Sequence, residues 1–109
     1  MGLQTTIWVR TSFIGFHYWE GAPEEVEYLR SPHRHLFKVV LEVPVSHDNR
    51  QTEFHQLKSQ LDTFLQDSFT AHVVPYSCEQ IAKQVQLVFG ASSVSVSEDG
   101  ECGATVREN

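Results

Sequence analysis

The first half of the chain alternates apolar and polar residues with a period of two, which is typical of strands that bury one face. One such segment is Thr5–His17, which is rich in β-branched and aromatic residues. The second is His33–Val45, in which alternate residues from Phe37 to Val45 are apolar. Between them, 18–32 is acidic, contains glycine and two prolines and has no sustained period, so it is predicted to be a loop.

Apolar residues then recur at helical spacing. The spacing over 53–69 predicts one helix. A second helix is predicted over 77–90, because Ser77 followed three residues later by a glutamine is the signature of a capping box. We expect Phe54 of the first helix and Val88 of the second to face the core.

The end of the chain returns to the pattern of strands. Two valines alternate with serines over 92–98, a turn follows at DGECG, and 104–108 is predicted to be a short returning strand. The order β-β-α-α-β-β, without an internal repeat or linker, predicts a single α+β domain over 1–109. We expect an antiparallel sheet with two helices on one face.

Charge and composition narrow the classes of partner. The 109 residues have a net charge of -6, with 8 Lys and Arg against 14 Asp and Glu, which argues against nucleic acid and against an anionic membrane surface. Cys78 and Cys102 form no CxxC motif, which is typical of a reducing compartment. The chain shows no signal peptide or membrane-spanning run, so we expect a soluble, cytoplasmic protein.

Three histidines lie where the first two predicted strands end and begin. His33 and His35 are two positions apart, so their side chains project from one face of a strand. His17 ends the preceding strand, which a hairpin-like return would bring close. Three imidazoles converging from two strands would bind a divalent metal, most readily zinc, with a fourth position open. The alternative is that they are polar residues at a strand start, since three further histidines occur in the chain.

Five short motifs support a more specific interpretation. They are FIGFH at 13–17, HRH at 33–35, TEFHQLK at 52–58, SCEQIA at 77–82 and VSVSEDGECG at 94–103. In this order they resemble the 6-pyruvoyl- and 6-carboxy-tetrahydropterin synthase family, whose members have the tunnelling fold. The resemblance covers about residues 5–107 and agrees with the predicted order of elements.

The resemblance implies a zinc ion bound by His17, His33 and His35. It also implies that Glu98 anchors a pterin, because a carboxylate can accept two parallel hydrogen bonds from the amino-pyrimidinone edge. Glu53 stands where the family has an aspartate ahead of its first helix and is assigned with Glu98 to substrate binding, a helix cap being the alternative. Finally, the family joins its sheets into an oligomeric barrel, so we expect a homo-oligomer, a trimer or hexamer.

The chain departs from the family at its acid-base groups. Leu29 stands where the enzymes have a proton-abstracting cysteine, and leucine cannot take a proton. Arg34 replaces the glycine between two zinc-binding histidines. The nearest match to the family's second catalytic group is His72, in a shortened segment, and His72 is the predicted catalytic residue.

Three functions are therefore open. The first is a zinc-dependent lyase acting on a substrate like dihydroneopterin triphosphate. The second is a non-catalytic protein that binds or sequesters a pterin- or purine-like ligand in the same pocket. A purely structural oligomer is the third, and it gives His17, His33, His35 and Glu98 no common purpose.

Overall fold

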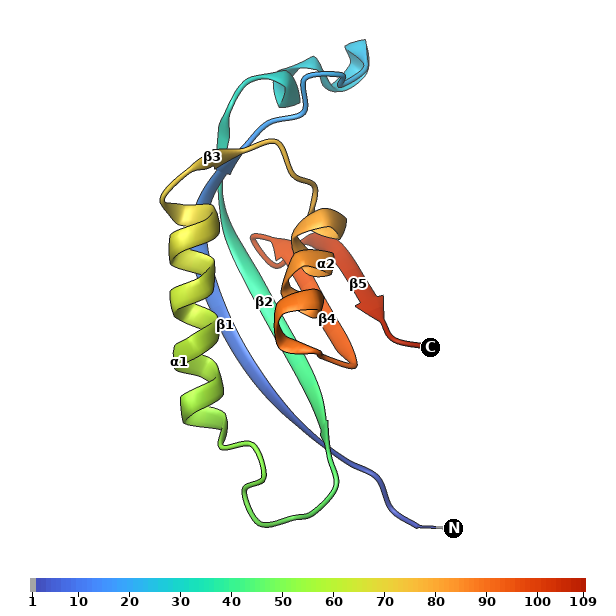
Figure 1. Ribbon diagram of the computed structural model, residues 1–109. Helices are drawn as coiled ribbons and strands as arrows, with labels where there is room; N and C mark the ends of the chain where they lie inside the picture. Colours follow the sequence, from blue (N-terminus) through green and yellow to red (C-terminus); the bar gives the residue numbers. More distant parts are fainter. Residues whose placement is uncertain (1) are drawn as a thin grey trace.

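Two long antiparallel strands run along the molecule in the computed structural model, which describes residues 2–109 (Figure 1). They are β1 (Thr5–His17) and β2 (His33–Val45), and both have the predicted bounds. The strands pair over their whole length, so that Thr5 lies opposite Val45 and His17 lies opposite His33. The 18–32 segment that joins them contains a short 3-10 helix, η1 (Glu24–Arg30), where the sequence predicted only a loop.

The sheet has five strands in the order β3-β1-β2-β4-β5. Strands β4 (Ser93–Glu98) and β5 (Cys102–Arg107) form the predicted C-terminal hairpin. Strand β4 pairs antiparallel with β2 on one side and with β5 on the other. The fifth strand, β3 (Val73–Val74), is absent from the predicted order and runs parallel to the end of β1. The prediction of a wholly antiparallel sheet was therefore wrong at this edge.

Both long helices cover the same face of the sheet and together make an α+β fold. Helix α1 (Phe54–Leu65) packs on β1, and α2 (Cys78–Phe89) packs on β4 and β5 (Figure 1). A π-helical turn, η2 (Gln66–Thr70), extends α1. One apolar core joins the two helices to the sheet. Its largest fully buried side chains are Phe37, Phe69, Leu41, Leu61, Leu65, Ile81, Val39, Val85, Val94 and Val96.

The start signals of both helices are local. The Glu53 carboxylate caps α1 by accepting hydrogen bonds from two backbone N–H groups of the first turn, which is the alternative role foreseen for this residue. Ser77 and Gln80 form the predicted capping box of α2. Gly90 ends α2 in the left-handed conformation, with φ of 61°, a position that favours glycine.

Two residues expected in the core are exposed. Phe54 is 50% exposed because it is the first residue of α1, one turn ahead of Leu57, where burial against the sheet begins. Val88 is 57% exposed because the residue that follows Val85 on the core-facing side of α2 is Phe89, four positions further on, and not Val88, three positions further on. Within residues 2–109, no helix has the length and apolar character needed to span a membrane.

Candidate metal centre and adjoining cavity

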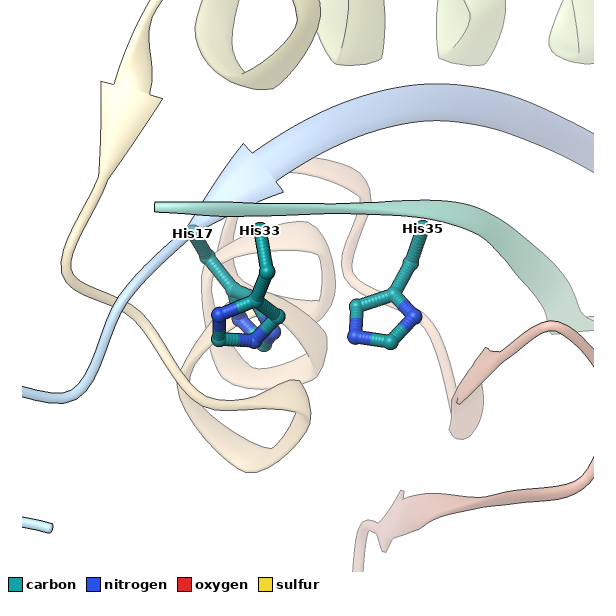
Figure 2. A group of neighbouring side chains, drawn as sticks. All are labelled: His17, His33 and His35. Carbon is teal, nitrogen blue, oxygen red and sulfur yellow. The ribbon is translucent and has the colours of Figure 1, made fainter. Parts of the chain in front are cut away.

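Three imidazole rings meet at one end of the β1–β2 hairpin. His17 is the last residue of β1 and lies opposite His33, the first residue of β2, while His35 lies two positions further along β2. All three residues have the parity of the helix-covered face, and Figure 2 shows the rings on one side of the strands. One ring nitrogen from each lies within 4.8 Å of the others. The predicted convergence of the histidines is confirmed.

The Nδ1 atom of each ring is held by an oxygen acceptor. The acceptors are the Tyr76 carbonyl for His17 at 2.8 Å, the Ser31 carbonyl for His33 at 2.9 Å and the Asp99 carboxylate for His35 at 2.7 Å. Because carbonyl and carboxylate oxygens only accept, each Nδ1 carries the proton and donates it. In a neutral imidazole this leaves the lone pair on Nε2 free, which is how histidines that bind metal are commonly fixed.

Two of the three Nε2 atoms are buried and make no hydrogen bond within residues 2–109. Among the described residues, neither His17 Nε2 nor His35 Nε2 has a hydrogen-bond partner. His17 is only 7% exposed, and burial is the main reason that its pKa is lowered from the ordinary value; the charges of His33 and His35 act in the same direction. A buried polar atom without a partner is costly. A neutral ring with an unpaired inward-facing nitrogen fits a metal ligand.

Glu98, the last residue of β4, reaches the same point. Its Oε2 atom lies 3.1 Å from His17 Nε2, and its Oε1 atom lies 3.5 Å from His35 Nε2. The carboxylate therefore comes from the same chain as the histidines. Glu98 is positioned by the sheet, because it pairs with Phe37 on β2, two residues beyond His35.

A tight turn places Asp99 behind His35. Asp99 and Gly100 connect β4 to β5 with φ values of 57° and 75°, as in a turn that favours Asp-Gly. One Asp99 oxygen accepts from the Leu36 N–H at 2.9 Å and the other accepts from His35. Both hydrogen bonds lower the pKa of Asp99, and the one from His35 has the larger effect. The turn thus gives His35 an ionised acceptor.

A cavity of about 710 Å³ opens beside the histidines. This volume is typical of small-molecule sites. Its wall contains two tyrosines, a tryptophan, two glutamates and both cysteines of the chain. The lining residues are His17, Tyr18, Trp19, Leu29, His33, Pro75, Tyr76, Ser77, Cys78, Glu79, Gln80, Glu98, Cys102 and Gly103. The structure thus places the metal-ligand candidates and a ligand-sized space together.

Of the other residues singled out in the sequence, some line the cavity and some lie elsewhere. Leu29 lines the cavity. Glu98 lines it as well, as does Glu79 of α2. His72 is exposed, just ahead of β3, and is not among the lining residues. Glu53 caps α1 and borders a different hollow, so the structure does not bring it to the histidines.

Several residues of the site were missed in the sequence. Cys102 pairs with Glu98 across the hairpin and lines the cavity, whereas the sequence predicted it in the turn before the last strand. Cys78 is buried, and desolvation raises the pKa of its thiol to about 12, so it stays protonated. The acceptor role of Asp99 required knowing that the turn folds back on β2. The Tyr76 carbonyl left no signal in the sequence.

Comparison with known proteins identifies a fold but no family. No protein-family model matches the chain, and no curated protein is significantly similar to it. Among solved structures, the chain is similar to an uncharacterized protein, WS1659, from Wolinella succinogenes, with a TM-score of 0.77 and 14% sequence identity. The match covers 99% of this chain and 100% of that protein. This similarity shows a shared fold.

Proposed function

We propose that this protein binds a divalent metal ion, zinc, through His17, His33 and His35, and a pterin- or purine-like small molecule in the adjoining cavity. One observation carries the proposal: three imidazoles converge, each with its Nδ1 hydrogen bonded to oxygen, and two of their Nε2 atoms are buried without a hydrogen-bond partner within residues 2–109. An all-nitrogen set is a typical zinc donor set.

The ligand class is supported by the walls of the cavity. Tyr18, Trp19 and Tyr76 offer flat surfaces on which a heterocycle can stack, and the Glu98 carboxylate offers acceptors for its N–H groups. These features agree with the resemblance to the tetrahydropterin synthase family. The arrangement of two helices on one face of the sheet supports a tunnelling fold in the same way.

Binding without turnover is the form of this function that we favour. The cavity has Leu29 where the family's enzymes have a cysteine, and His72 is not part of the wall. The lyase is the second candidate, and one observation favours it: Cys102 is a free thiol on the cavity wall and could move a proton in place of the missing cysteine.

The metal proposal is tested by measuring the zinc content of the purified protein. We expect about one ion per chain, lost in His33→Ala and in His35→Ala. His55→Ala is the matched control, because His55 is exposed on α1 and should leave the metal content unchanged. Zinc at about 100 times its Kd should stabilise the fold by about 2.7 kcal/mol. A protein that binds no zinc, or keeps it in His33→Ala, would refute the proposal.

The ligand proposal is tested with a reduced pterin and with guanosine as probes. Trp19 lines the cavity, whereas Trp8 is on β1 and outside it, so Trp19 fluorescence reports on binding. We expect saturable quenching that Trp19→Phe removes and Trp8→Phe keeps. Incubation with dihydroneopterin triphosphate then separates the two candidates. Product formation that disappears in Cys102→Ser would establish the lyase, and binding without product would establish the non-catalytic protein.

We also propose that the chain forms a homo-oligomer, a trimer or hexamer, in the cytoplasm. Among the described residues, β3 pairs with only the last two residues of β1, which leaves the rest of that long edge open, and edge strands favour partners. Two free cysteines suit a reducing compartment. Light scattering of the purified protein gives the mass, and a monomer at all concentrations would refute this proposal.

A further inference from the structure

The carboxylate of Glu98 contacts two histidines in a way that hydrogen bonding does not explain. Its two oxygens lie 3.1 Å from His17 Nε2 and 3.5 Å from His35 Nε2. Both nitrogens nevertheless lack a hydrogen-bond partner among the described residues. The nitrogens are therefore close to the carboxylate without being aligned with it.

This is the geometry of ligands that share one ion. Zinc lies about 2.0–2.2 Å from nitrogen and oxygen ligands, so two ligands of a tetrahedral site are about 3.4 Å apart. Each ligand then points its lone pair at the ion and not at its neighbour. The observed separations, 3.1 Å from Oε2 to His17 Nε2 and 3.5 Å from Oε1 to His35 Nε2, lie on either side of that value. Each oxygen of the carboxylate is therefore at the separation of a fellow ligand from one histidine nitrogen.

We propose that Glu98 supplies an oxygen ligand to the metal, so that the centre is three histidines and one carboxylate. This inference rests on the proposed metal site and adds a fourth protein ligand to it. The fourth position, which the histidines alone leave open, is filled from within the chain. A small molecule in the cavity then lies beside a closed centre, or reaches the metal only by displacing Glu98.

The turn after β4 holds this carboxylate in place. Glu98 ends β4, and the Glu101 N–H donates to the Glu98 carbonyl at 3.0 Å. The Asp99 N–H donates to the Leu36 carbonyl at 2.8 Å, which ties the turn to β2. Because Asp99 has a left-handed backbone, two consecutive carboxylates serve one site, Glu98 at the metal and Asp99 behind His35.

The experiment measures metal affinity in Glu98→Gln, with Glu79→Gln as the matched control. Glu79 lines the same cavity, so its substitution removes the same charge from the same wall without touching the histidines. Zinc affinity is measured by competition with a chelator. The visible spectrum of the Co²⁺-substituted protein reports the ligand set. Circular dichroism and thermal unfolding of the metal-free variants establish that they fold.

We expect Glu98→Gln to weaken zinc binding at least about tenfold and to alter the Co²⁺ spectrum, since even supporting residues around a metal commonly contribute 10–100-fold. Glu79→Gln should change neither. If Glu98→Gln folds and binds zinc as tightly as the unaltered protein, with the same Co²⁺ spectrum, this inference is overturned while the three-histidine site stands. Equal weakening in both variants would also overturn it, since that is a general effect of charge. Failure of the unaltered protein to bind zinc would overturn both proposals.

Discussion

Replacing Asp99 by asparagine tests whether the hydrogen bond behind His35 prepares that ring for a metal. Asp99 accepts from His35 Nδ1 at 2.7 Å and from the Leu36 N–H at 2.9 Å. Asparagine tolerates the left-handed backbone at this position, where φ is 57°. The substitution can therefore keep the turn and the hydrogen bond to Leu36. The asparagine NH2 group then takes the place of the second Asp99 oxygen, so the charge and the hydrogen bond from His35 are both lost.

The size of the effect follows from what asparagine retains. A carboxylate behind a metal-binding histidine raises the basicity of the ring and fixes its orientation, and loss of such a partner commonly costs 10–100-fold in affinity. With its carbonyl oxygen on the Leu36 N–H, asparagine cannot also accept from His35 as Asp99 does, but the turn beside the ring is kept. We expect Asp99→Asn to weaken zinc binding about tenfold. Asp99→Ala, which loses both hydrogen bonds, should weaken zinc binding more, by close to about a hundredfold.

The assay is zinc competition with a chelator at constant pH. Asp48→Asn is the control, because Asp48 is an exposed carboxylate that bonds to Thr5 near the opposite end of the hairpin. It should leave zinc affinity unchanged. The reasoning is refuted if Asp99→Asn and Asp48→Asn bind zinc equally well, or if Asp99→Ala is no weaker than Asp99→Asn.

Three further predictions concern the fold. Leu61→Ala should destabilise the protein by about 2–5 kcal/mol, because Leu61 is fully buried. Leu87→Ala is the control, since this side chain is 79% exposed and its loss should change stability by less than about 0.5 kcal/mol. Urea unfolding measures the free energy of unfolding of both variants. Ser77→Ala should cost about 1 kcal/mol through the lost cap of α2, which thermal unfolding measures, and an unchanged midpoint would contradict the role of the capping box. The hydrogen bonds from the first turn of α1 lower the pKa of the Glu53 carboxyl group. The ionised carboxylate therefore stabilises the fold at neutral pH, and this stabilisation is lost as the pH falls through the lowered folded-state pKa. Glu53→Gln should accordingly be less stable than the unaltered protein at pH 7, with the difference in melting temperature shrinking in acid; a difference that is constant with pH would speak against the cap.

The sequence was sufficient where the determinants of structure are local. Period-two alternation predicted the bounds of β1 and β2, and the spacing of His33 and His35 placed both side chains on one face of β2. Capping chemistry placed the start of α2 at Ser77. These features depend on neighbours within a few residues, which is why a single sequence reveals them.

The features that escaped prediction depend on contacts between distant segments. Strand β3 has only two residues, too few to show a period, and exists because the chain after α1 lies alongside the end of β1. The acceptor for His17 is the backbone of Tyr76, 59 residues away, and a backbone carbonyl leaves no mark on side-chain identity. Cavity membership of Cys102 likewise depends on the register of β4 and β5.

The register of the hairpin connects the apolar core to the candidate metal centre. Phe13 and Phe37 lie opposite each other and stack with ring centroids 5.0 Å apart. Gly15 leaves room for this packing, since a Cβ there would lie 3.0 Å from Phe13 and 3.1 Å from Phe37 and the rings would have to shift. A shift of one residue would turn His17 to the opposite face of the sheet. The packing that holds Phe13 opposite Phe37 therefore also holds His17 opposite His33, so the core itself brings the histidines together, and a metal would bind to rings already in place.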